Sequence, residues 1–170
     1  MKLLMHMCCA PCSVYPASLL LSEGIEFDGL FFNPNIHPID EFEKRKENVE
    51  IFCRMKNINV EVMDDYLQEK WELFDGEEAQ RCNMCYSVRL DKTARYALEK
   101  GYSAFTTSLL VSPYQKHDLI KSIGEKCAEK YGINFYYRDF RPGFRQGQAM
   151  AKEMGLYRQK YCGCILSKPR

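Results

Sequence analysis

The sequence contains no long uninterrupted hydrophobic run, although 46% of its 170 residues are hydrophobic. A membrane-spanning helix needs roughly 18 to 20 consecutive apolar residues, and no window approaches that length. The N-terminus also lacks the charged, apolar and then small-residue pattern of a secretory signal. We therefore expect a cytoplasmic protein with no membrane partner, folded as a single α/β domain over residues 1–170.

The sequence also lacks internal repeats, low-complexity tracts and an interdomain linker, and it has almost no net charge, with 24 basic and 23 acidic residues. The charges are unevenly distributed. Residues 40–78 contain 13 acidic and 6 basic residues, whereas residues 138–170 contain 8 basic and 2 acidic residues. The basic segment is a candidate face for an anionic partner, although a solvated charged surface fits the same pattern.

Cysteine, in contrast, is abundant, with nine residues. In a reducing cytoplasm their spacing indicates metal ligation or catalysis more than a disulfide framework. Two of them, Cys53 and Cys127, lie in apolar helical patterns, and we expect them to be core residues. The other seven form a dense first cluster, a C-x-x-C and a C-x-C: Cys8, Cys9, Cys12, Cys82, Cys85, Cys162 and Cys164.

Short apolar runs alternate with helical patterns along the chain. The alternation predicts a Rossmann-like, parallel five-stranded sheet with helices on both faces, followed by a basic, loop-rich C-terminal tail. The carboxyl ends of parallel strands meet at one edge, where such folds bind ligands. The predicted strands cover 2–7, 27–32, 59–63, 104–109 and 134–137, and the predicted helices cover 13–22, 42–55, 66–74, 82–100, 117–131 and 148–154.

Seven clustered thiols exceed what one metal centre needs. A structural zinc and a [4Fe–4S] cluster each commonly take four thiolates, so the count favours two centres. Cys82 and Cys85 stand at a predicted helix start, where the helix dipole favours thiolate over thiol. Two alternatives stay open: one structural zinc with incidental thiols, as in an RNA-binding module, or a thiol-disulfide or electron-transfer protein that uses the C-x-x-C.

Motifs spread in order along nearly the whole chain resemble the QueH family of epoxyqueuosine reductases. They are Cys8-Cys9-Ala10-Pro11-Cys12-Ser13, residues 32–38, Arg81-Cys82 with Cys85-Tyr86, Thr107 with Ser112-Pro113, Asp139-Phe140-Arg141, and Tyr157-Arg158-Gln159 with Tyr161-Cys162-Gly163-Cys164. The resemblance implies removal of the epoxide oxygen from epoxyqueuosine in a tRNA anticodon, without cobalamin. It also implies a [4Fe–4S] cluster, a neighbouring mononuclear iron held by the same cysteines, and an external electron donor.

The predicted fold is also similar to the nucleotide-binding group, called HUP, that includes the ATP-pyrophosphatases. Those enzymes cradle phosphate with a Ser-Gly-Gly-x-Asp-Ser loop after the first strand. Residues 8–13 of this chain occupy that place without paired glycines. We therefore predict that ATP is not a cofactor and that metal takes the position of the phosphate.

Further site residues follow from their places at predicted strand ends. We expect Asp139 to be a carboxylate ligand of the single iron, ahead of Asp118 and Asp64. His37 and His117 are candidates to protonate the leaving oxygen, with a structural or surface role as the alternative. Base stacking or core packing is expected for Tyr114, Phe140 and Tyr161, and phosphate binding for Arg141, Arg145, Arg158 and Lys160.

Overall fold

The computed structural model describes residues 2–169 and contains one five-stranded sheet in the order β3-β2-β1-β4-β5. Every neighbouring pair of strands is parallel, which confirms the predicted Rossmann-like α/β fold. The central strand β1 lies between β2 and β4, so the chain that leaves β1 emerges in the middle of the carboxyl edge. The strands are β1 (Lys2–His6), β2 (Glu26–Phe31), β3 (Val60–Val62), β4 (Ala104–Thr107) and β5 (Asn134–Phe135).

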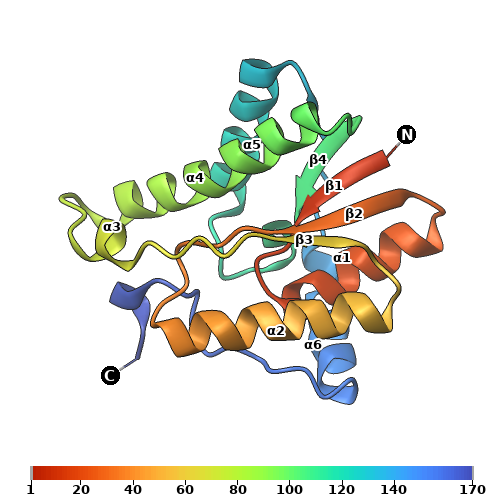
Figure 1. Cartoon of the computed structure of the whole chain (residues 1–170), viewed down its shortest axis with the longest axis horizontal. Coiled ribbons are helices and arrows are strands. Elements are labelled where there is room, and N and C mark those ends of the chain that lie inside the picture. The colour runs from red at the N-terminus through yellow and green to blue at the C-terminus, as the bar shows by residue number, and fades with distance from the viewer. Residues whose placement is uncertain (1, 170) are drawn as a thin grey trace.

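Helices cover both faces of this sheet. Figure 1 shows α4 and α5 on one side of it and α1, α2 and α6 on the other. None of the helices within residues 2–169 is long and apolar enough to cross a membrane. The α-helices are α1 (Ala10–Ser22), α2 (Ile39–Met55), α3 (Gln68–Glu72), α4 (Glu78–Glu99), α5 (His117–Tyr131) and α6 (Phe144–Glu153), and the 3-10 helices are η1 (Ser108–Val111), η2 (Arg141–Gly143) and η3 (Ile165–Ser167).

Alternation along β1 divides the core into two layers, because successive strand side chains point to opposite faces. Leu3 and Met5 pack with side chains of α1, α2 and α6, whereas Leu4 packs with side chains of α4 and α5. Cys53 and Cys127 are buried in these two layers, as predicted. The single-domain prediction covers residues 1–170, and its two ends, Met1 and Arg170, lie outside the described residues.

Helices α1 and α4 begin earlier than predicted, and both shifts change the places of cysteines in the helices. The sequence predicts a helix that starts at residue 82, but α4 begins at Glu78, because Glu77 and Gln80 form a capping box. Cys82 therefore lies beyond the first turn, where the dipole effect fades. Helix α1 begins at Ala10, since proline is tolerated in a first turn, and it carries Cys12 there.

The tail is also less loop-like than predicted. Helix α6 begins at Phe144, four residues before the predicted start at Gln148, and it packs against α1. Gly147 allows this packing, because a Cβ at that position would lie 3.0 Å from the Cβ of Tyr15. The remainder of the chain, residues 157–167, runs back across the molecule to the carboxyl edge of the sheet, where it meets α2 and α3.

Candidate metal centre

Three of the seven clustered cysteines form a compact group, the thiol trio, made of Cys8, Cys9 and Cys12. Their sulfur atoms all lie within 4.8 Å of one another, with Cys8 Sγ and Cys9 Sγ 3.9 Å apart. Within residues 2–169, this is the only group of three or more Cys, His, Asp or Glu side chains close enough to hold one metal ion. Thiolates at about 2.3 Å from a tetrahedral ion lie about 3.8 Å apart, so the trio has the dimensions of a single-ion site.

The trio is surrounded by hydrogen-bonding groups from distant segments. Ser108, which follows β4, accepts a hydrogen bond from the Cys8 backbone N–H and donates one to Cys8 Sγ over 3.2 Å. The Gln159 side-chain amide lies 2.6 Å from Cys9 Sγ. Hydrogen bonds from Cys12 and Cys9 hold the pKa of Cys8 well below its ordinary value, whereas burial raises that of Cys9. The three thiols therefore share hydrogen bonds and differ in the direction of their pKa shifts.

A buried polar network fixes the strand ends beneath the trio. The imidazole of His6 lies 2.9 Å from Thr107 Oγ1 on β4 and 3.1 Å from the Phe32 carbonyl after β2. Asn33 accepts from the same imidazole and donates to the Met7 carbonyl. Burial lowers the pKa of His6 to about 4, so the ring is neutral near pH 7. His6 therefore acts as a rigid connector between β1, β2 and β4.

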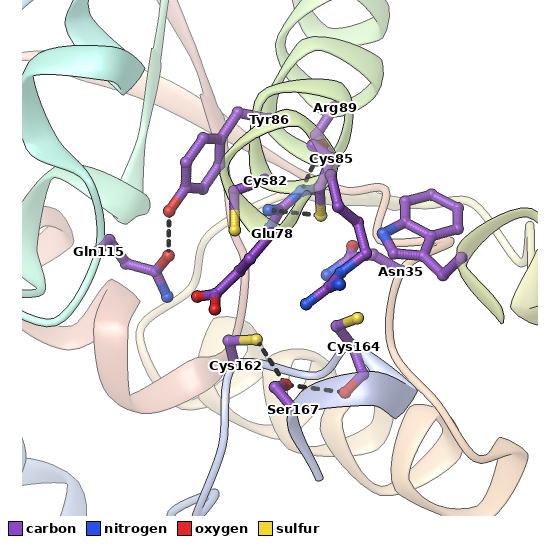
Figure 2. A pocket seen from close by; sticks show the side chains of 12 residues that line it. Asn35, Glu78, Cys82, Cys85, Tyr86, Arg89, Gln115, Cys162, Cys164 and Ser167 are labelled. Atoms are coloured by element: carbon purple, nitrogen blue, oxygen red, sulfur yellow. Dashed lines mark hydrogen bonds between the residues drawn. The ribbon is translucent and has the colours of Figure 1, made fainter. Parts of the chain in front are cut away.

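The other four clustered cysteines form the thiol quartet, made of Cys82 and Cys85 on α4 together with Cys162 and Cys164 on segment 157–167. Figure 2 shows the two pairs facing each other across one cavity. The cavity has a volume of about 70 Å³, several times the roughly 10–15 Å³ that is needed to hold one water. The quartet thus surrounds a space far larger than a single ion needs.

The wall of this cavity is largely buried and carries unused polar groups. Asn35 is only 2% exposed, and its side-chain oxygen has no hydrogen-bond partner within residues 2–169. The indole N–H of the fully buried Trp71 is likewise without a partner. Burial raises the pKa values of Cys85 and Cys164. The expectation that a helix start makes the C-x-x-C thiols acidic is therefore wrong for Cys85, because its burial dominates.

Segment 157–167 is held against the body by main-chain contacts. Arg45 on α2 donates to the carbonyls of Tyr161 and Cys162 over 2.9 and 3.1 Å, and the His37 backbone N–H donates to the Gly163 carbonyl. Gly163 has φ +123°, and a Cβ there would lie 3.1 Å from the Arg45 guanidinium. The glycine of the C-x-C is therefore required both by backbone conformation and by space.

The structure gives His37 and Tyr161 structural contacts. The fully buried His37 ring uses both nitrogens, Nε2 donating to the Pro34 carbonyl and Nδ1 accepting from the Ile165 backbone N–H. The Tyr161 hydroxyl donates to the His37 carbonyl, and its ring lies under the Arg45 guanidinium. For His37 these contacts favour the structural alternative over proton transfer.

Asp139 and His117 lie together, away from the quartet cavity. The Asp139 carboxylate accepts from the Arg141 side chain through both oxygens at 2.8 Å, and one oxygen lies 4.0 Å from His117 Nε2. Arg141 lowers the pKa of Asp139 to about 2. Among the described residues, Asp139 is not grouped with the thiols as a metal ligand, nor are Asp64 and Asp118. Its role as an iron ligand stays a prediction, and its ion pair argues against it.

The remaining predicted residues divide between core and surface. Phe140 is 0% exposed, so its ring belongs to the core and is not available to stack on a base. Tyr114 is 84% exposed and contacts only the edge of Phe144 among the aromatic rings of residues 2–169. Its stacking role stays a prediction. The side chains of Arg141, Arg145, Arg158 and Lys160 are exposed, as phosphate contacts would require.

Several residues that build the site were not predicted from the sequence. His6 could have been found, since it interrupts an apolar strand two residues before Cys8. Arg89 follows Cys85 by four residues, which places both on one face of a helix. Gln159 belongs to the Tyr157-Arg158-Gln159 motif, but no role was predicted for it. Arg45 and Ser108 have no comparable signal, because only the tertiary structure brings them to the site.

Comparisons with known proteins identify the family of this chain. The family model described as epoxyqueuosine reductase QueH matches residues 3–170. The epoxyqueuosine reductase QueH of Thermotoga maritima is 38% identical over 96% of this chain and 88% of its own length. That of Dehalococcoides mccartyi is 35% identical over 98% of this chain and 92% of its own length.

Solved structures support the fold. The U34-tRNA thiolase NcsA of Methanococcus maripaludis, solved with its [4Fe-4S] cluster, aligns with 99% of this chain at a TM-score of 0.66 and 16% identity. This chain spans 62% of the thiolase chain. At that identity the likeness shows that the two chains share a fold. The family match over residues 3–170 and the two relatives above 30% identity together show that this chain belongs to the epoxyqueuosine reductase QueH family.

Proposed function

We propose that this protein is a cobalamin-independent epoxyqueuosine reductase that acts on tRNA carrying epoxyqueuosine in its anticodon. The observation that carries the proposal is the separation of seven thiols into a compact trio and an open quartet at the carboxyl edge of the sheet. An external donor supplies the electrons. ATP is not required in this proposal, and the cytoplasmic location stays a prediction from the sequence.

The two thiol groups fit two different metal centres. The quartet offers four sulfurs around a cavity larger than one ion needs, which suits a [4Fe–4S] cluster. The trio offers three sulfurs at single-ion spacing and leaves a coordination position free, which suits one iron with an open site. A [4Fe-4S] cluster is also bound by the thiolase NcsA, whose fold this chain shares.

The reaction breaks both C–O bonds of the epoxide, forms a C=C bond and releases the oxygen as water, consuming two electrons and two protons. Bound metals would supply the electrons and an electron-poor partner for the departing oxygen. Ser108 and Gln159 hold the trio sulfurs from either side, and His6 keeps the strand ends beneath them in register. The protein therefore contributes a fixed donor geometry.

We assign the delivery of one of the two protons to His117. Its Nδ1 has no hydrogen-bond partner within residues 2–169, and Nε2 lies 2.7 Å from the Tyr137 hydroxyl. His117 is the first residue of α5. Helix α5 packs against η1, and η1 carries Ser108, which donates a hydrogen bond to Cys8 Sγ. Asp139, with its pKa of about 2, stays ionised near neutral pH and is not the proton donor in this proposal.

The experiment is anaerobic purification followed by counts of iron and acid-labile sulfide. We expect about five irons and four sulfides per chain, the sum of one cluster and one single iron. Cys8→Ser is expected to lose about one iron and keep its sulfide, and Cys162→Ser to lose the sulfide. Cys127→Ser, a core thiol outside both groups, is the matched control and should keep both metals.

The activity is then measured as conversion of epoxyqueuosine to queuosine in tRNA by the reduced protein. Conversion by the parent and the control, but by neither site variant, supports the proposal. Zinc without sulfide would refute it and indicate a zinc-stabilised RNA-binding module. Activity that survives iron removal but is abolished by dithiol blocking would refute it in favour of a thiol-disulfide protein.

A further inference from the structure

Arg89 is a buried cation at the wall of the quartet cavity. Its side chain is on the α4 face that carries Cys85, one helical turn earlier, and the residue is 4% exposed. The guanidinium donates from Nε to the Cys85 carbonyl over 3.1 Å and from Nη2 to Cys85 Sγ over 3.2 Å. Figure 2 shows this contact above the cavity.

The guanidinium has no carboxylate partner. Arg89 takes part in none of the salt bridges found within residues 2–169. The other buried arginine, Arg45, lies 3.6 Å from Glu41. Burying an unpaired charge is costly, so the fold must supply negative charge to Arg89 from another source.

Thiolates would supply that charge when the quartet holds metal, because metal-bound cysteines are deprotonated. Arg89 Nη2 lies 3.2 Å from the sulfur of Cys85. Its ring neighbour Tyr86, whose centroid lies 5.5 Å away, and His6, which is neutral near pH 7, add no negative charge. Arg89 is therefore a buried cation in contact with a quartet sulfur.

We propose that Arg89 is a positioning residue that sets the reduction potential of the quartet's metal centre. The proposal rests on the proposed iron–sulfur function and goes beyond it. Each added electron makes a thiolate-bound cluster more negative, and a fixed cation in a water-poor wall stabilises that state. Hydrogen bonds to ligand sulfur act in the same direction.

The contact geometry explains the choice of arginine. A guanidinium is always charged and presents several donors in a fixed plane, so one side chain can hold the Cys85 carbonyl and sulfur together. A lysine would keep the positive charge but would lose the planar set of donors that reaches both Cys85 atoms. A methionine would fill similar space without charge or donors.

The test compares anaerobically loaded Arg89→Met, Arg89→Lys and Arg89→Gln with the parent protein. Reduction potentials are measured by a spectroscopic redox titration, together with iron and sulfide content. Arg95→Met removes a half-exposed charge of the same helix and is the matched control. Circular dichroism and thermal melts of the metal-free variants report on folding, and Arg89→Gln provides the neutral replacement if Arg89→Met does not fold.

We expect a lower potential in the neutral variants, so that most of the cluster stays oxidised at the potential where the parent is half reduced. The potential of Arg89→Lys should fall between, and that of Arg95→Met should match the parent. Loss of the cluster from Arg89→Met and Arg89→Gln, but not from Arg89→Lys, also supports the proposal, because the positive charge then retains the cluster. Equal potentials in all variants, or cluster loss from Arg89→Lys as well, would overturn it. A parent protein without sulfide would instead refute the proposed function itself.

Discussion

The Nδ1 atom of His37 accepts a hydrogen bond from the backbone N–H of Ile165 over 3.1 Å. This contact joins the loop after β2 to the residue that follows Cys164. Because Nε2 is occupied by the Pro34 carbonyl, neither nitrogen is free for catalysis. The histidine thus serves the site by holding the C-x-C in place.

His37→Ala should therefore weaken metal binding without changing chemistry. Removing the ring leaves the Ile165 N–H without its partner, at a cost of about 1–3 kcal/mol, whereas the Pro34 carbonyl still accepts from the Leu67 N–H. We expect less iron and sulfide per chain, but unchanged turnover per bound cluster. A large drop in turnover per cluster would restore His37 as a catalytic candidate.

Gly163→Ala should be more damaging than Gly155→Ala. Both glycines have positive φ, at +123° and +72°, but nothing lies within 4 Å of a Cβ at Gly155, whereas Arg45 and Ile36 crowd one at Gly163. Backbone strain alone costs of order 1–3 kcal/mol in either variant. The measurement is sulfide per chain, with Gly155→Ala as the control, and equal losses would contradict the crowding.

The metal-free protein should lose stability as the pH falls from 7.5 towards 5.5. Burial lowers the pKa values of His6, His37 and His117 below the ordinary value of about 6.5, so the folded chain binds fewer protons than the unfolded chain. The lowered pKa of Cys8 acts in the same direction. Asp139, with its pKa of about 2, contributes only at lower pH.

Chemical denaturation at several pH values tests this effect. The free energy of unfolding should decline through the window that begins near pH 6.5 and, for His6, extends to about 4. A free energy that stays constant or rises as the pH falls from 7.5 to 5.5 would contradict the burial of neutral imidazoles.

Exposed arginines should make tRNA binding sensitive to salt. Arg145→Ala and Arg158→Ala are each expected to reduce the slope of log affinity against log salt by about 0.7 to 0.9. Arg141→Ala should have a smaller effect, because its charge is shared with Asp139. Arg54→Ala, an exposed arginine at the end of α2, is the control. An equal change of this slope in all four arginine variants would show that the net charge of the protein, and not the position of these side chains, determines the salt dependence.

Asp139→Asn should leave iron content unchanged, because Arg141 already occupies both carboxylate oxygens. The variant instead loses the ion pair between residue 139 and Arg141. We expect this loss to change the salt dependence of tRNA binding. Loss of one iron per chain from this variant would establish the ligand role that the sequence suggests.

The sheet could be predicted because its signals are local. Apolar runs such as residues 2–7 and the spacing of α5 specify their elements directly, and α5 occurs over the predicted residues. The start of α4 could not be placed from periodicity, because Glu77 and Gln80 act through a capping box outside the apolar pattern. Motifs likewise identified all seven thiols.

The grouping of those thiols could not be predicted, since it depends on where segment 157–167 crosses the molecule. Arg45 holds that segment through backbone carbonyls, and such contacts leave no trace in residue type. Asp139 shows a different limit of the sequence. A carboxylate at a strand end suggested a ligand, and only the structure shows that Arg141, two residues later, pairs with it, while the ligand role stays a prediction.

The quartet joins a helix to a segment that is distant in sequence, so a cluster bound there would be a cross-link as well as a redox centre. Its four thiolate bonds would limit the freedom of the unfolded chain and would add the binding free energy to native stability. Without metal, segment 157–167 is held by hydrogen bonds to α2, to the loop after β2 and to Cys9, and by the packing of η3 against α3. Proteases and amide hydrogen exchange should then reach this segment first, while the sheet stays closed.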